Sequence, residues 1–258
     1  MTSIFLDIFI FLLGLIMGSF LTCVIYRLEQ KMDFVRGSSM CPKCKHPLAW
    51  YDLLPVLSFL FLKGRCRYCK EKISWQYPSI EILTAVVFVW IFNYFSIPAS
   101  IYYLIITCFL LLIFIYDLKH FIIPDSIVFS AIGLSLAFRI AEAIWYRDIY
   151  VVYNSFLAVL VGFAFFFLIF AVSRGKWMGF GDVKFSVFMG LFLGFPGVAI
   201  AIFFSFLIGG IIGTGLIISK KKGLKSEVPF GPFLVIGTFI ALFWGQSILN
   251  WYLNLLAF

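Results

Sequence analysis

Charged residues are scarce in this sequence. Asp, Glu, Lys and Arg make up only 12% of its 258 residues, whereas hydrophobic residues make up 63%. Soluble domains carry roughly 25% charged residues, so this composition argues against a soluble protein and predicts a membrane protein. The apolar runs are continuous and do not alternate with polar residues, which argues against a transmembrane β-barrel.

The features of a cleaved signal peptide are also missing. No basic residue precedes the first apolar run, at 4–26, and no small-residue cleavage pattern follows it. We therefore expect this run to remain in the protein as a membrane anchor. A helix needs about 20 apolar residues to cross the hydrocarbon of a bilayer. About eight runs predict an all-α polytopic membrane protein, with spans near 4–26, 79–96, 100–117, 126–146, 150–172, a short 183–196, 198–219 and 231–257.

Glycines four residues apart recur in the predicted spans. Small residues at this spacing lie on one face of a helix and let two backbones approach closely. We therefore expect close helix packing at three pairs, which are Gly14 with Gly18, Gly190 with Gly194, and Gly209 with Gly213.

Basic residues are distributed unevenly between the predicted spans. If the amino terminus lies outside, all of the 20 Lys and Arg residues except Arg139 and Arg147 fall on the inner side, including the four lysines between 220 and 225. Inner loops of membrane proteins are enriched in basic residues, so we predict an outer amino terminus and a cytoplasmic loop at 27–78. This bias accounts for most of the net charge of +8, which points to anionic lipid and not to nucleic acid as a partner.

The loop at 27–78 carries four of the six cysteines, Cys41, Cys44, Cys66 and Cys69. The spacing C-x2-C-x21-C-x2-C is typical of a zinc ribbon, in which two turns each present two thiolates to one Zn²⁺. The alternatives are two disulfides, which a reducing cytosol disfavours, or four free thiols. Four thiolates leave no open coordination position, so the zinc would be structural. The chain then divides into three predicted parts, a first span at 1–26, a zinc-binding loop domain at 27–78 and a seven-helix membrane core at 79–258.

Two of the twelve acidic residues, Asp117 and Asp182, suggest a shared site. Asp117 ends the third span and Asp182 opens the sixth, so counting the crossings places both at cytoplasmic helix ends. Ionisable residues at such positions are by default a hypothesis of a functional site. Paired carboxylates in a poorly solvated site share a proton, so that one acts as a base toward water while the other donates to a substrate carbonyl. The pair therefore suggests peptide hydrolysis in the manner of aspartic proteases.

Two glycines, Gly179 and Gly181, precede Asp182 in the segment "GFGD". They give the backbone unusual freedom and let an extended substrate chain approach the carboxylate. The alternative is structural, because Asp favours helix starts, where its carboxylate accepts hydrogen bonds from free backbone N–H groups. The residues alone leave both interpretations of Asp182 open.

Three further charged residues have structural interpretations. Asp125 follows a proline at the start of the fourth span, where we expect it to cap the helix. Lys184 lies two residues from Asp182 and points to the other side of the helix, so we expect it to reach lipid headgroups. Glu81 lies one turn into the second span, where it either complements the helix dipole or lines the cavity of the two aspartates.

Five blocks follow one another along nearly the whole chain. They are "GSFLTCVIYRLE" (18–29), "CPKCKHPLAWYDLLPVLSFLFLKGRCRYCKEKISWQYPSIEILTA" (41–85), "DLKHFIIPD" (117–125), "GFGDVKFSVFMGLFLG" (179–194) and "VPFGPFL" (228–234). In this order they resemble the bacterial type IV prepilin peptidases, which are leader peptidases with N-methyltransferase activity. Thr22 stands where that family often has Asn, but no departure touches the paired aspartates or the four cysteines.

The resemblance implies an eight-span aspartic protease of the GxGD kind. Its catalytic pair would be Asp117 and Asp182, and Gly179 and Gly181 would form the supporting loop. Similar proteins lie in the bacterial inner membrane and remove a basic leader from prepilins and pseudopilins. They cut after a glycine at the cytoplasmic face.

The resemblance also implies methylation of the new amino terminus with S-adenosylmethionine. No G-x-G-x-x-G loop or other motif in the sequence specifies that cofactor. By resemblance, the methyl-donor site is placed near the cysteine loop, around Gly64 and Arg65.

Two other classes of function use the same residues. A proton-coupled transporter would use the two aspartates as a relay and the glycines to break a helix, although transporters place such groups near the bilayer midplane and often show internal repeats. A membrane anchor whose zinc loop recruits partners would use the aspartates only as caps. Alanine at either aspartate would then leave function intact.

Overall fold

The structure is a computed structural model, and it describes residues 2–30, 32, 39–219 and 228–256. By its internal contacts the chain forms two compact units, Met1–Leu112 and Ile113–Phe258. The three parts predicted from the sequence concern membrane topology and stay a prediction. The four lysines between 220 and 225, which contributed to the predicted orientation, lie outside the described residues.

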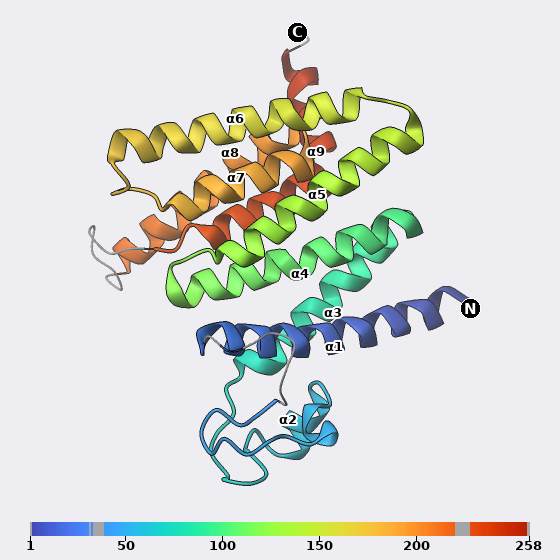
Figure 1. The fold of residues 1–258 in the computed structure, drawn as a ribbon, viewed down its shortest axis with the longest axis vertical. Coiled ribbons are helices and arrows are strands. Elements are labelled where there is room, and N and C mark those ends of the chain that lie inside the picture. Colours follow the sequence, from blue (N-terminus) through green and yellow to red (C-terminus); the bar gives the residue numbers. More distant parts are fainter. Residues whose placement is uncertain (1, 31, 33–38, 220–227, 257–258) are drawn as a thin grey trace. The chain divides into compact units, whose positions relative to one another are not determined.

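The described residues are almost entirely helical, which confirms the predicted fold class. They contain no β-strand, and their strand-like pairings are two isolated bridges, Met40 with Pro47 and Arg65 with Lys72. The described helices (Figure 1) are α1 (Thr2–Glu29), the 3-10 helix η1 (Trp50–Leu53), α2 (Leu57–Phe61), α3 (Gln76–Tyr94), α4 (Ile97–His120), α5 (Asp125–Tyr146), α6 (Tyr150–Ser173), α7 (Phe180–Leu193), α8 (Gly197–Ile218) and α9 (Gly231–Leu256).

Seven of the described helices, α1, α3, α4, α5, α6, α8 and α9, are long and apolar enough to cross a membrane. The remaining predicted span, at 183–196, corresponds to α7, which has only 14 residues. With a rise of 1.5 Å per residue, α7 is about 21 Å long, which is shorter than the hydrocarbon core of about 30 Å. The chain is thus a polytopic helical membrane protein with one short helix among its long ones.

The short helix α7 is the most enclosed element of the second unit. It contacts α5, α6, α8 and α9 (Figure 1), and nine of its 14 residues are buried. Gly190 allows the contact with α6, because a Cβ at this position would lie 2.6 Å from the backbone of Val159. Since protein surrounds α7, its length does not have to match the thickness of the lipid.

A side chain of α5 holds the C-terminal end of α7. The guanidinium of Arg139 donates hydrogen bonds to the carbonyl of Leu191, across 2.9 Å, and to the carbonyl of Phe192. It also pairs with Glu142, its Nη1 atom lying 2.7 Å from the carboxylate. The last carbonyls of a helix have no partner within the helix. Arg139 therefore supplies hydrogen bonds to carbonyl groups that the termination of α7 at Leu193 would otherwise leave without a donor.

In the first unit, α1 packs closely against α3. A Cβ on Gly14 would lie 2.5 Å from the Cα of Ala85, and a Cβ on Gly18 would lie 2.6 Å from the Cα of Glu81. The close packing predicted for this glycine pair is therefore confirmed.

In α8 one glycine of the predicted pair makes a close contact, because a Cβ on Gly209 would lie 3.0 Å from the ring of Phe233 on α9. A Cβ on Gly213 would meet nothing within 4 Å, so the prediction for this residue is wrong. The tight approach between α8 and α9 occurs at Gly237, whose added Cβ would clash with the carbonyl of Ala201 and with Ser205. Gly237 has no glycine partner four residues away, and the spacing rule therefore does not select it.

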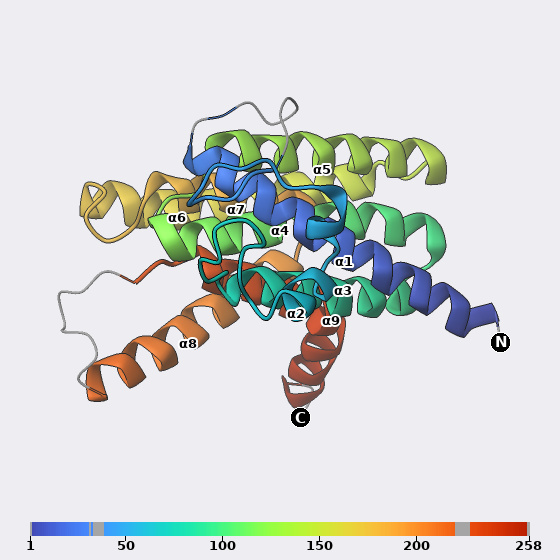
Figure 2. The same cartoon turned by 90° about the horizontal axis from the view of Figure 1, so that it is seen from below.

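The described part of the loop between α1 and α3, residues 39–75, lies against both helices (Figures 1 and 2). Lys45 Nζ donates a hydrogen bond to the hydroxyl of Tyr26 on α1, across 3.0 Å. The backbone N–H of Val56 donates to Glu81 on α3, across 2.7 Å. These polar contacts attach the cysteine-bearing loop to the helices that flank it in the sequence.

Candidate functional site

Asp117 lies near the C-terminal end of α4, and only 4% of its surface is exposed. The backbone N–H of Gly231 donates a hydrogen bond to Asp117 Oδ2 across 2.9 Å. Gly231 is the first residue of α9, so this N–H is one of the free donors of a helix start. A Cβ at position 231 would lie 2.6 Å from the same oxygen. The sequence reasoning missed Gly231, although it falls within the block "VPFGPFL".

Asp182 lies in the first turn of α7, and 8% of its surface is exposed. Gly179 is the N-cap residue, so Asp182 is the third residue of the helix and does not occupy the cap position. Its carboxylate accepts a hydrogen bond from the backbone of Gly179 and interacts electrostatically with Asp117. The structure therefore brings the two predicted aspartates together in the second unit, and Asp182 also makes a contact of the capping type.

The two glycines of "GFGD" have different environments. Gly181 packs against the segment that follows α4, and a Cβ on it would lie 3.1 Å from the Cβ of Ile123. Gly179 is exposed, and a Cβ there would meet no atom closer than 3.8 Å, the nearest being Asp182 Oδ2. Gly181 thus serves close packing between the two aspartate-bearing segments, whereas the space beside Gly179 is open.

An ion pair joins the same two segments. Lys184 Nζ lies 2.6 Å from Asp125 Oδ1, and the lysine also lies over the ring of Phe180, 5.3 Å from its centroid. Pro124 is the N-cap of α5, and that helix start has no side-chain cap. The expectations that Asp125 caps the helix and that Lys184 reaches lipid headgroups are therefore wrong. The attraction between opposite charges on neighbouring elements outweighs both local preferences.

The four cysteines of the first unit lie in two turns of the same construction. In the first turn the N–H of Cys41 donates to the carbonyl of His46, and the N–H of Lys45 donates to the carbonyl of Cys41. In the second turn Cys66 bonds to Glu71 and Lys70 in the same way. Both lysines, Lys45 and Lys70, have a positive φ, of 59° and 60°. Two segments far apart in the sequence thus adopt the same turn conformation, as the zinc-ribbon spacing predicts.

The four cysteine sulfur atoms lie within 4.8 Å of one another, and those of Cys41 and Cys69 are 3.9 Å apart. Zn–S bonds of about 2.3 Å in a tetrahedron separate the sulfur atoms by about 3.8 Å, so this donor set fits Zn²⁺. No disulfide joins any of the four, all of which are free cysteines. Burial would raise the pKa of the Cys41 thiol, but hydrogen bonds from the backbone of Cys44 and Lys43 lower it to about 7. At Cys69 a hydrogen bond from the backbone of Glu71 lowers the pKa, but burial and the neighbouring cysteines raise it to about 11.

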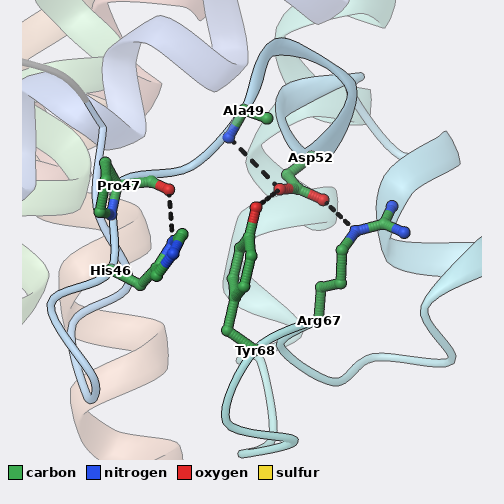
Figure 3. A network of polar contacts seen from close by, with 6 residues as sticks. All are labelled: His46, Pro47, Ala49, Asp52, Arg67 and Tyr68. Carbon is green, nitrogen blue, oxygen red and sulfur yellow. Dashed lines mark hydrogen bonds and ion pairs between the residues drawn. The ribbon is translucent and has the colours of Figure 1, made fainter.

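Asp52 connects η1 to the second cysteine turn (Figure 3). Its carboxylate accepts hydrogen bonds from Arg67 Nε at 2.7 Å, the Tyr68 hydroxyl at 3.1 Å and the N–H of Ala49 at 3.3 Å. Burial would raise the pKa of Asp52, but these hydrogen bonds hold it below its ordinary value. The Tyr68 ring also stacks on His46 of the first turn, with centroids 3.7 Å apart. The sequence reasoning missed this network because no spacing rule selects Asp52.

Gly64 and Arg65 lie just before the second cysteine turn. Gly64 has a φ of 67°, and a Cβ on it would lie 3.1 Å from the ring of Phe59. Arg65 is exposed. Their predicted role in binding S-adenosylmethionine stays a prediction, and the geometry gives Gly64 a role in the turn.

Two features now define the class of this chain. It is a polytopic helical membrane protein with a buried pair of aspartates in one unit and a four-cysteine cluster that can bind a metal in the other. The model of the family described as "Bacterial Peptidase A24 N-terminal domain" matches residues 12–95, and the model described as "Type IV leader peptidase family" matches residues 104–214.

The similarity to individual relatives extends over nearly the full length of the chain. A prepilin leader peptidase/N-methyltransferase of Bacillus subtilis is 31% identical over 249 residues, which cover 95% of this chain and 97% of the relative. The protein of the same name from Aeromonas salmonicida is 30% identical over a gapped alignment of 277 positions, which covers 95% of this chain and 93% of the relative. A third, from Myxococcus xanthus, is 49% identical over 81 residues, or 31% of this chain and 24% of the relative. No solved structure matches the chain.

The chain therefore belongs to the type IV leader peptidase family, and it is a membrane peptidase with methyltransferase activity. This membership sets aside the transporter and the passive anchor as its class.

Proposed function

We propose that the enzyme cleaves the leader from type IV prepilins and pseudopilins, with Asp117 and Asp182 as its catalytic pair. One observation carries this proposal. The two aspartates are 65 positions apart in the sequence, from 117 to 182, yet both are buried and their carboxyl groups interact. Burying two carboxyl groups that act on each other electrostatically is costly and finds its explanation in catalysis.

The chemistry follows from the arrangement of the pair. The ionised carboxylate takes a proton from a water molecule, and the protonated carboxyl group donates to the carbonyl oxygen of the scissile peptide bond. The exposed Gly179 beside Asp182 leaves space for an extended substrate backbone. The Gly231 N–H orients Asp117, and the Lys184–Asp125 ion pair fixes the segments that carry the two acids.

The proposed substrate is a prepilin whose hydrophobic helix lies in the bilayer and whose basic leader stays in the cytoplasm. The enzyme cuts after a glycine at the cytoplasmic face of the bacterial inner membrane. The excess of Lys and Arg in alternate loops supports an amino terminus outside, with the cysteine loop and the aspartates inside. The names of the full-length relatives support prepilins as the substrate class.

We also propose that the four cysteines hold a structural Zn²⁺ and that S-adenosylmethionine donates the methyl group for the new amino terminus. The sulfur geometry supports zinc, and the names of the relatives support N-methylation. Chelation of the zinc and the Gly64→Ala substitution are each expected to lower methylation while cleavage continues. If both treatments left methylation intact, the placement of the methyl-donor site around Gly64 and Arg65 would be wrong.

The peptidase proposal is tested by co-expression with a prepilin and mass analysis of the pilin amino terminus. Wild type is expected to give a shortened, methylated product, whereas Asp117→Asn and Asp182→Asn should each leave the precursor uncut. Asp148→Asn provides a charge-matched control, because Asp148 is an exposed residue outside the site. Normal processing by either of the first two variants would show that the catalytic pair is misassigned.

A further inference from the structure

The first unit contains a cavity of about 970 Å³. The C-terminal part of α1, the N-terminal part of α3 and the cysteine loop form its walls, which include the buried residues Cys41 and Cys66. Small-molecule sites measure about 300–1,000 Å³, so this cavity has room for a cofactor together with the end of a peptide chain. The catalytic aspartates belong to the other unit, and the proposed cleavage does not use this cavity.

One buried carboxylate lines the cavity. Glu81 on α3 is 7% exposed, and its Oε2 atom accepts a hydrogen bond from the N–H of Val56 across 2.7 Å. Its carboxylate also forms a hydrogen bond with the Ser19 side chain. A carboxylate can accept about four hydrogen bonds, so these two contacts leave acceptor capacity for a ligand.

The cavity also has basic side chains on its walls, those of Arg27, Lys43, Arg67 and Lys72. Within the described ranges of the chain, none of the ion pairs involves Glu81. Burying an ionised carboxylate without a cation is costly, and a cationic ligand group would remove that cost. The backbone that Glu81 contacts is also strained, because Val56 is β-branched and has a φ of 60°. Strain of this kind gathers at functional sites.

We propose that methyl transfer takes place in this cavity and that Glu81 binds the free α-amino group of the processed pilin. The inference rests on the methyltransferase part of the proposed function and assigns it a place and a residue. The walls of the cavity also suit the methyl donor. Phe20 and Tyr77 offer aromatic surfaces for a purine base and for a sulfonium cation.

An α-amino group is largely protonated at neutral pH and then has no lone pair for attack. Glu81 accepts one proton from the ammonium group, which leaves a neutral amine. The nitrogen lone pair forms the new N–CH3 bond while the S–CH3 bond of the sulfonium donor breaks, and that electron pair stays on sulfur. The products are an N-methylammonium ion and a thioether, and the proton on Glu81 passes to water.

The same cavity gives Gly64 a physical connection to methylation. Phe59 lines the cavity, and its ring is the group that a Cβ on Gly64 would contact at 3.1 Å. A side chain at position 64 would therefore disturb the wall through Phe59, even though Gly64 itself does not line the cavity.

The test uses purified full-length enzyme, S-adenosylmethionine and a synthetic amino-terminal pilin peptide that needs no prior cleavage. Glu81→Gln keeps an oxygen that accepts the Val56 N–H but removes the proton acceptor. We expect this variant to methylate the peptide about 100-fold more slowly, the lower end of the contribution of a general base. Its cleavage of precursor, zinc content and affinity for S-adenosylmethionine should stay at wild-type values, which shows that the variant is folded.

Asp148→Asn is the matched control. It also removes one negative charge and keeps an oxygen that accepts a backbone N–H, that of Tyr150. We expect it to methylate at the wild-type rate. A second control uses the same peptide with an acetylated amino terminus, which has no free α-amino group for Glu81 to bind. This peptide should bind no more weakly to Glu81→Gln than to wild type.

Three outcomes would overturn the proposal. Methylation by Glu81→Gln at the wild-type rate would reduce Glu81 to a structural role. Native mass spectrometry that detects a bound phospholipid, and shows that S-adenosylmethionine does not displace this lipid, would identify the cavity as a lipid site. A wild type that cleaves precursor but neither binds the donor nor methylates would refute the methyltransferase part of the proposed function as well. Conversely, a wild type that methylates the peptide but leaves precursor uncut would refute the peptidase assignment alone.

Discussion

At the residue scale, the position of Asp117 depends on a glycine from a distant helix. Gly231 supplies the N–H that binds Asp117, and its lack of a side chain lets the carboxylate approach. We predict that Gly231→Ala lowers the cleavage rate about tenfold or more, because displacing a catalytic group by about 1 Å has a large effect on rate. Purified enzyme and prepilin in a time course followed by mass spectrometry provide the measurement.

The control for this prediction lies on the same helix. A Cβ on Gly245 would meet only Ile200, at 3.9 Å, which is an ordinary contact distance. Gly245→Ala should therefore cleave at the wild-type rate. Equal rates for the two alanine variants would show that Gly231 does not position Asp117.

The network around Asp52 predicts a pH dependence for the cysteine loop. Because the folded structure lowers the pKa of Asp52, its stabilising effect is present above the unfolded pKa of about 3.9 and is lost as the pH falls through the folded value. Asp52→Asn should raise amide hydrogen exchange in residues 39–75 by roughly tenfold at pH 7, the effect of losing about 1.5 kcal/mol from one hydrogen bond to a charged group. The difference from wild type should shrink below about pH 4. An equal difference at both pH values would contradict this account of Asp52.

The aspartates and cysteines were accessible from sequence, whereas the partners of the other charged residues were not. Asp117 and Asp182 drew attention because acids are rare in apolar runs, and the cysteines because two pairs share one spacing. The interpretations of Asp125 and Lys184 were wrong because each considered only its own helix. Their pairing, across 59 positions, depends on how α5 and α7 pack.

At the element scale, α7 forms the core of the second unit, and its tightest contact is with α6. We predict that Gly190→Ala destabilises the protein by about 1–3 kcal/mol, the usual effect of overpacking, because its Cβ would meet the Val159 backbone at 2.6 Å. Gly213→Ala on α8 has free space and should be neutral or stabilising by up to about 1 kcal/mol, since alanine favours helices. Thermal unfolding of the purified variants in detergent measures both effects. A Tm for Gly190→Ala equal to or above that of Gly213→Ala would contradict the packing.

The long helices were well predicted, because a continuous apolar run specifies both the length of a helix and its location in the apolar part of the membrane. Glycine spacing was less reliable. It identified Gly14, Gly18, Gly190 and Gly209 but missed Gly237, whose contact with α8 comes from a single glycine and not from a repeated pattern. Spacing on one helix cannot predict which face its neighbour occupies.

At the scale of the whole molecule, the short helix α7 decides the topology. If it counts as a crossing, the eight spans place both termini on the same side of the membrane, and the proposed orientation places that side outside. We therefore predict that alkaline phosphatase fused after residue 258 is active, whereas the same enzyme inserted after residue 175, between α6 and α7, is inactive. An inactive carboxyl-terminal fusion of full-length protein would show that α7 does not cross the membrane.

The central claim is that Asp117 and Asp182 act as one unit in peptide hydrolysis. It is tested most directly by single-turnover cleavage of a prepilin by purified Asp117→Asn, Asp182→Asn and the double variant, with methylation of a pre-cut peptide as the measure of correct folding. Residues that act as a unit show strongly non-additive losses, so all three variants should fall to the same residual rate while methylation persists. Losses that multiply in the double variant, or a single variant that keeps more than about a tenth of the wild-type rate, would contradict the account.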